Sequence, residues 1–154
     1  MEEKEEHEDK YCSKSDIFGY LIAYEDDELV GGVELFKRKI NYSNKLILLG
    51  GFGSLWVRED KRRQGIALEV LKRGMKILKK ESCDLAYLCT DINKLKDLYS
   101  KVGFMPLGKD YSFTGKSGKK YIEDDGMIAP VNSEKNFKQI IEDNKPLDIG
   151  LGNW

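Results

Sequence analysis

One long apolar run, Leu46–Val57, constrains the fold most, because an amphipathic helix follows it closely. Its sequence, LILLGGFGSLWV, is too short to cross a bilayer as a helix and predicts a buried strand. The glycines at Gly50, Gly51 and Gly53 predict a β-bulge or the close approach of another group. From Ile66 to Leu78, apolar residues recur at helical spacing. A strand that leads into an amphipathic helix indicates a sheet with helices packed on it.

Shorter segments on both sides extend this pattern. Phe18–Tyr24 and Leu29–Phe36 are typical of two hairpin strands, and Leu85–Thr90 of a buried strand. A second helix is expected over about Ile92–Val102, with Gly103 as its stop. Further predicted elements are a loop at Ile40–Asn44, two strands around Gly115–Gly118, and a short helix capped by Ser133. This order predicts an α/β (α+β) fold with a mixed, mostly antiparallel sheet and flanking helices.

Length and charge exclude several classes of protein. The 154 residues suit one domain, which we expect over residues 18–154 after a polar segment at 1–17. That segment is either part of a helix or disordered. The net charge of −1 favours neither nucleic acid nor an anionic membrane as a partner. The acidic start, MEEKEEHEDK, is unlike a signal peptide.

The cysteines indicate the compartment. The three cysteines are odd in number and lack any metal-ligand spacing, so the sequence predicts reduced thiols and no metal site. A cytoplasmic protein is therefore expected. Cys89 is expected to be an unreactive strand residue.

The junction between the long strand and the helix is the first candidate site. It contains Arg62, Arg63, Gln64, Gly65, Ile66 and Ala67. The first turn of a helix has free N–H donors and a partial positive charge, which suit a phosphate or pyrophosphate. Gly65 lacks a Cβ and lets an anion come close to the backbone. The arginines can add charge-assisted hydrogen bonds. The alternative is a solvated run of charges that leads into a surface helix.

Two motifs resemble those of the GNAT family of acyl-CoA-dependent N-acetyltransferases. The family pattern Arg/Gln-x-x-Gly-x-Gly/Ala is matched by Arg62, Gly65 and Ala67. A downstream Leu-Tyr followed by Gly-Phe is matched at Leu98–Tyr99 and Gly103–Phe104. The resemblance covers about residues 18–110, with both motifs in the family order. It implies a GNAT fold, with the N-terminal strand and helices shortened, because only seventeen residues precede the first expected strand.

The resemblance also implies a donor site for acetyl-CoA as co-substrate. Backbone groups of Leu55, Trp56 and Val57 would pair with the pantetheine arm. The Arg62–Ala67 turn would hold the pyrophosphate, with Arg63 and Gln64 either taking part or contributing only backbone. An Asn that often contacts CoA in the family has no equivalent here, because Ile92 occupies its position.

Tyr99 is the implied catalytic acid. Attack of an amine on a thioester expels a thiolate, and a phenol can donate a proton to that sulfur. The alternative is a tyrosine that only packs. Many family members carry a glutamate as base on the long strand, but that position here is Gly53. Glu34 on the preceding strand is one substitute, and a water chain is the other.

The last third of the chain resembles the aminoglycoside 2′-N-acetyltransferases and, more distantly, NodA-type acyltransferases. The shared features are the EDDGMIAPV segment at Glu123–Val131 and a terminal Trp. By position, Asp124, Asp125 and the carboxylate of Trp154 would bind ammonium groups of the substrate. The alternatives are a common hairpin turn and a tryptophan that plugs a core.

The expected function is transfer of an acetyl group from acetyl-CoA to a primary amine of a small cationic molecule, aminoglycoside-like or polyamine-like. One alternative is a protein or peptide N-acetyltransferase with the same donor site. The other is a non-catalytic CoA-binding module, motivated by the short N-terminus and the absent base. A small-molecule amine is the expected partner, and a homodimer is left open.

Overall fold

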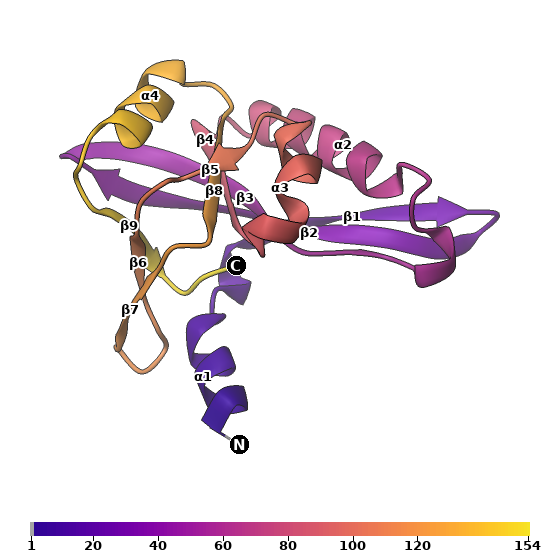
Figure 1. Ribbon diagram of the computed structural model, residues 1–154, viewed down its shortest axis with the longest axis horizontal. Coiled ribbons are helices and arrows are strands. Elements are labelled where there is room, and N and C mark those ends of the chain that lie inside the picture. Colours follow the sequence, from indigo (N-terminus) through magenta and orange to yellow (C-terminus); the bar gives the residue numbers. More distant parts are fainter. Residues whose placement is uncertain (1) are drawn as a thin grey trace.

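The computed structural model describes residues 2–154 and contains two β-sheets with helices around them (Figure 1). The strands are β1 Ile17–Glu25, β2 Glu28–Tyr42, β3 Lys45–Val57, β4 Leu85–Cys89, β5 Met105–Pro106, β6 Tyr111–Thr114, β7 Lys120–Glu123, β8 Gly126–Pro130 and β9 Leu147–Leu151. The helices are α1 Glu2–Lys10, α2 Ile66–Lys80, α3 Ile92–Ser100 and α4 Glu134–Glu142, with 3-10 turns η1 at Lys14–Asp16 and η2 at Glu59–Lys61.

The larger sheet has the strand order β1-β2-β3-β4-β8-β5, and the smaller has β7-β6-β9. Neighbouring strands are antiparallel except for the parallel pairs β3–β4 and β6–β9. This confirms the expected mixed, mostly antiparallel sheet. None of the helices in residues 2–154 is long and apolar enough to cross a membrane.

The ribbon β1–β2–β3 is built by two tight hairpins. The turn residues Asp26 and Asp27, and likewise Ser43 and Asn44, all have positive φ, as two-residue hairpin turns of this kind require. The predicted loop at residues 40–44 is therefore wrong in part, because β2 continues to Tyr42. Ile40 and Tyr42 alternate along the strand and are buried, so core packing extends the hairpin to its turn.

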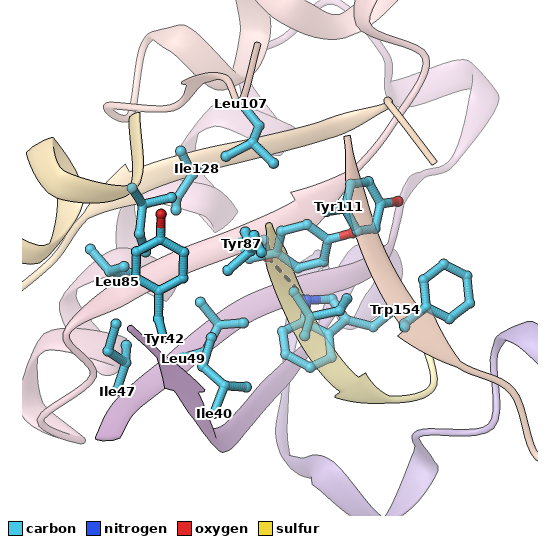
Figure 2. Close-up of a cluster of buried hydrophobic side chains, with 14 of the residues drawn as sticks. Ile40, Tyr42, Ile47, Leu49, Leu85, Tyr87, Leu107, Tyr111, Ile128 and Trp154 are labelled. Carbon is cyan, nitrogen blue, oxygen red and sulfur yellow. Dashed lines mark hydrogen bonds between the residues drawn. The ribbon is translucent and has the colours of Figure 1, made fainter. Parts of the chain in front are cut away.

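Two apolar clusters lie on opposite faces of the larger sheet. On one face, α2 and α3 pack on Val33, Leu35 and Phe52. On the other face, the small sheet and α4 enclose a cluster that includes Tyr87, Tyr111 and Trp154 (Figure 2). The sheet is thus buried on both faces around β3 and β4. As predicted, the Ser133 hydroxyl caps α4 by accepting a hydrogen bond from the Asn136 backbone N–H.

The polar N-terminal segment forms α1, which has no buried residue and is attached by polar contacts. Asp9 Oδ1 accepts a hydrogen bond from the Ser117 backbone N–H at 2.6 Å, and Asp9 Oδ2 accepts one from the Tyr121 hydroxyl at 2.7 Å. Lys10 forms an ion pair of 2.7 Å with Glu123. The helix alternative for this segment is therefore confirmed, and α1 lies beside the β6–β7 hairpin (Figure 1).

Candidate active site

Strands β3 and β4 run side by side for a short stretch and then separate. They pair in parallel only where Leu49–Gly51 lies next to Leu85–Tyr87. On its other edge, β3 stays paired with β2 as far as Val57. In the part of the chain that the structure describes, residues 52–57 of β3 therefore have no strand partner on the β4 side. Their backbone groups can bind a ligand in the manner of an added strand.

A β-bulge in β3 lies at this separation. Glu34 is opposite Gly53, but Gly32 is opposite Trp56, so β3 has one residue more than β2 across this interval. Ser54 lies within it and has a positive φ of 51°. This confirms the bulge predicted from the glycines of the run. The predicted close approach of another group to these glycines is also confirmed, since a Cβ on Gly51 would overlap the Tyr87 carbonyl oxygen.

A cavity of about 470 Å³ opens where the two strands separate. Its wall combines residues from β2, β3, β4 and α3 with residues from both ends of the chain. Leu55, Tyr99, Glu34 and Trp154 all line it. The structure therefore brings the implied acid, one candidate base, and part of the implied pantetheine strand to one place. Trp56 and Val57 lie outside this wall, further along β3.

Tyr99 is placed on α3 and is almost fully buried, with 6% of its surface exposed. Its ring packs edge-on against Phe104, with the ring centroids 6.1 Å apart. Burial raises the pKa of the Tyr99 phenol, and a hydrogen bond with the Thr90 side chain partly offsets this. The phenol is therefore protonated at neutral pH and can donate a proton inside the cavity.

Glu34 is the only residue with a carboxylate side chain among those of the described chain that line the cavity. It is half-buried on β2 and lies in register with Tyr20 on β1 and Gly53 on β3. Gly53, which occupies the position of the family's glutamate, therefore has the Glu34 carboxylate as its cross-strand neighbour.

Cys89 also lines the cavity, at the end of β4. Burial raises the pKa of its thiol to about 11, and the thiol donates a hydrogen bond of 3.1 Å to the Trp154 carbonyl oxygen. The thiol is therefore protonated near neutral pH, which makes it a weak nucleophile. This agrees with the expected unreactive strand cysteine.

The turn before α2 presents free backbone donors. Gly65 is the N-cap residue and has a positive φ of 82°, and Arg63 has one of 63°. No backbone N–H from residue 63 to 68 donates to a backbone carbonyl elsewhere in residues 2–154. Arg62, Arg63, Gln64 and Gly65 are exposed, while Ile66 and Ala67 are half-buried. Arg62 Nε donates a hydrogen bond of 3.1 Å to the Val57 carbonyl, which connects the turn to the strand end.

The structure separates the residues predicted at the acceptor side. The Trp154 ring is buried in the cavity wall, stacked on Phe36 with centroids 4.9 Å apart. Asp124 is exposed, whereas Asp125 accepts a hydrogen bond of 2.5 Å from the Tyr111 hydroxyl. Neither aspartate lines the cavity. Their role as ligands of the acceptor stays a prediction.

Several cavity residues have no counterpart in the sequence-based site. They are His7, Tyr11, Ser13, Lys14, Phe36, Phe52, Ser54, Leu88, Thr90, Leu95 and Asn153. The positions of Thr90 after a buried strand and of Ser54 among the glycines are local signals for two of them. The N-terminal residues offered no such signal, because their place in the wall depends on contacts between α1 and the distant β6–β7 hairpin.

Comparison with known proteins identifies the class. Residues 1–107 match the family described as an acetyltransferase (GNAT) domain, so the chain belongs to the GNAT acetyltransferase family. No curated protein matches the chain.

Solved structures of this class share the fold at low sequence identity. A GNAT family N-acetyltransferase (YhbS) from Escherichia coli in complex with CoA superposes with a TM-score of 0.62 at 16% identity, over 90% of this chain and 69% of that one. Naa20 from Chaetomium thermophilum in complex with a bisubstrate analogue superposes with a TM-score of 0.60 at 12% identity, over 85% of this chain and 75% of that one. Eis1 from Mycobacterium abscessus superposes with a TM-score of 0.53 at 17% identity over 60% of this chain. This chain spans only 23% of the length of that Eis1 chain.

Proposed function

We propose that this chain transfers an acetyl group from acetyl-CoA to a primary amine of a small cationic molecule, by direct attack of the amine on the thioester. The observation that carries the proposal is the separation of β3 from β4 beside the buried phenol of Tyr99. An open strand edge suits an amide-containing arm, and the adjacent acid suits a leaving thiolate. A cytoplasmic location is part of the same proposal.

The donor would lie along β3 and reach the turn before α2. The pantetheine amides would pair with the free edge of β3 near Leu55–Val57. The pyrophosphate would accept hydrogen bonds from the free N–H groups at the start of α2, aided by Arg62 and Arg63. The positive φ of Gly65 supports this role, because it presents the N–H groups in an open turn without a side chain in front of them.

Tyr99 would supply the proton that the leaving sulfur needs. The amine nitrogen forms a bond to the carbonyl carbon, and the carbon–sulfur bond then breaks with its electrons going to sulfur. The phenol donates its proton to that sulfur, and the nitrogen gives up its extra proton, which restores the phenol directly or through water. The products are an amide and CoA thiol. Because burial raises the pKa of Tyr99, the phenol is present in its acidic form across the neutral range.

The attacking nitrogen must be neutral, so the ammonium has to lose a proton first. Glu34 would accept it directly or through water, because it is the only residue with a carboxylate side chain in the described cavity wall. A covalent acyl-cysteine route is disfavoured, because the Cys89 thiol has a raised pKa of about 11.

Release of CoA thiol from acetyl-CoA, measured over a panel of small amines and peptides, tests this function. We expect turnover with at least one small primary amine. Acetylation confined to peptide N-termini would replace the proposal with the peptide alternative. Binding of acetyl-CoA without turnover on any acceptor would indicate the non-catalytic module.

A further inference from the structure

A second, smaller cleft of about 170 Å³ lies beside the cavity, on the ribbon formed by β1, β2 and β3. The strand register explains why its residues lie together. Tyr20 of β1 is opposite Glu34 of β2, and Gly32 of β2 lies between Ile22 and Trp56. These side chains share one face of the sheet, because residues two apart on a strand point the same way.

The cleft has aromatic and aliphatic walls that are exposed to solvent. The exposed fractions are 63% for Tyr20, 48% for Ile22 and 43% for Trp56. Gly32 also lines the cleft, and a Cβ added there would lie 3.1 Å from Trp56 Nε1, so the indole packs closely against the glycine. The exposed indole, phenol and aliphatic chain give this cleft a largely apolar lining.

Among the described residues, Glu34 is the only charged one that lines this cleft, and it also lines the larger cavity. Ser54, at the bulge, is likewise shared by the two. A molecule lying on Trp56 can therefore reach the Glu34 carboxylate, and beyond it the cavity that holds Tyr99. The Glu34 carboxylate favours a cation at one end of the cleft, and the aromatic faces favour an apolar group beside it.

We propose that this cleft is the acceptor subsite and that it selects primary amines on an apolar stem, alkyl or aryl. The inference rests on the proposed function and adds the substrate class to it. The stem would lie against Trp56 and Tyr20, with its ammonium group directed to Glu34 and Tyr99. A volume of about 170 Å³ suits one ring or a short alkyl chain, since a cavity of about 150 Å³ holds benzene.

The same walls disfavour other amines. A polyhydroxylated amino sugar would leave hydroxyl groups against apolar side chains without hydrogen-bond partners. The backbone of Trp56 belongs to β3, so its role toward pantetheine and the role of its side chain toward the acceptor are independent. Substitution of the side chain therefore changes the acceptor site and leaves the donor strand in place.

The test compares phenethylamine, hexylamine, ethanolamine and glucosamine as acceptors for the wild type, Trp56→Ala and Trp56→Phe. We expect the apolar amines to have the lower KM in the wild type. Trp56→Ala should raise the KM for phenethylamine about fivefold to thirtyfold, with the KM for acetyl-CoA unchanged. Trp56→Phe should retain most of the affinity. Tyr24→Ala is the control, because Tyr24 is an exposed aromatic residue on β1 that lies outside this cleft.

Direct binding keeps this inference separate from the proposed function. Phenethylammonium binding, measured by calorimetry without acetyl-CoA, should weaken in Trp56→Ala and be unaffected in Tyr24→Ala. Equal binding by wild type and Trp56→Ala would overturn the subsite, whether or not the protein acetylates amines. A preference for glucosamine or for peptide N-termini would overturn the substrate class. Selective binding without turnover would retain the subsite and refute the proposed function.

Discussion

The indole Nε1 of Trp154 donates a hydrogen bond of 3.0 Å to the backbone carbonyl oxygen of Tyr87, the last residue of β4 that pairs with β3 (Figure 2). A Cβ on Gly51, the paired residue of β3, would overlap this carbonyl and crowd the indole. Trp154 thus lies at the point where the two strands begin to separate. It satisfies a strand carbonyl at that point with a side-chain donor.

Trp154→Ala should therefore destabilise the protein by about 3–5 kcal/mol, the usual cost of removing a buried aromatic side chain. Trp154→Phe should cost less, because the ring remains while the hydrogen bond to Tyr87, worth about 1 kcal/mol, is lost. Denaturant unfolding measures both. Leu151→Ala, at an exposed position in β9, should have little effect. Equal stability of Trp154→Ala and the wild type would contradict a structural role for the indole.

Tyr99→Phe should reduce turnover by roughly 10²–10⁴-fold without weakening acetyl-CoA binding, since it removes a positioned acid. Steady-state kinetics and calorimetry give the two quantities. Tyr42→Phe is the matched control: it removes the hydroxyl of a buried tyrosine that contacts Asp143, away from the cavity. Full turnover in Tyr99→Phe would show that water protonates the sulfur.

The pH dependence offers a second check on Tyr99. Because burial raises its pKa, the phenol keeps its proton beyond the ordinary value of about 10. The midpoint of any loss of turnover caused by Tyr99 ionisation should therefore lie above about pH 10. A fall in turnover with rising pH whose midpoint lies below pH 10, and which is absent in Tyr99→Phe, would contradict the raised pKa.

Gly65→Glu should abolish the thermal stabilisation that acetyl-CoA causes, because it adds a negative side chain at the proposed pyrophosphate site. Glutamate at a positive φ is also strained, so the variant needs a control for strain alone. Gly118→Glu provides one, since Gly118 has a φ of 90° and open space around it. We expect the Gly118 variant to keep the full ligand-induced shift in melting temperature. The same shift in a folded Gly65→Glu variant would exclude this turn as the donor site.

Asp9 should make the attachment of α1 sensitive to acid. Hydrogen bonds from the Tyr121 hydroxyl and the Ser117 N–H lower its pKa in the folded protein. A lowered folded pKa means that this stabilisation is complete above the ordinary value of about 4 and is lost as the pH falls through the lowered value. The amide shift of Ser117, followed by NMR, should titrate below about pH 4 and lose that titration in Asp9→Asn. A midpoint above pH 4 would refute the lowered pKa.

Several features were predictable because they are encoded locally. Apolar alternation and helical spacing gave the order of β1 to β4, α2 and α3, but not the strands β5 and β9. The glycines of the long run marked the β3 bulge. The Arg62–Ala67 turn could be identified as a site with free N–H donors, since the end of a strand and the start of a helix are both local signals. The loop predicted at residues 40–44 was wrong over Ile40–Tyr42, because this mostly polar segment continues β2 and its alternate side chains, Ile40 and Tyr42, are buried.

The sequence by itself determined these elements, the strand–turn–helix junction and the location of Tyr99 on a helix. Only the tertiary structure decided which distant residues meet. It placed Trp154 on the Tyr87 carbonyl, α1 on the β6–β7 hairpin, and Trp56 across Gly32 beside Tyr20. Backbone propensity and periodicity act over a few residues, whereas these contacts depend on strand register and on burial between segments far apart in the chain.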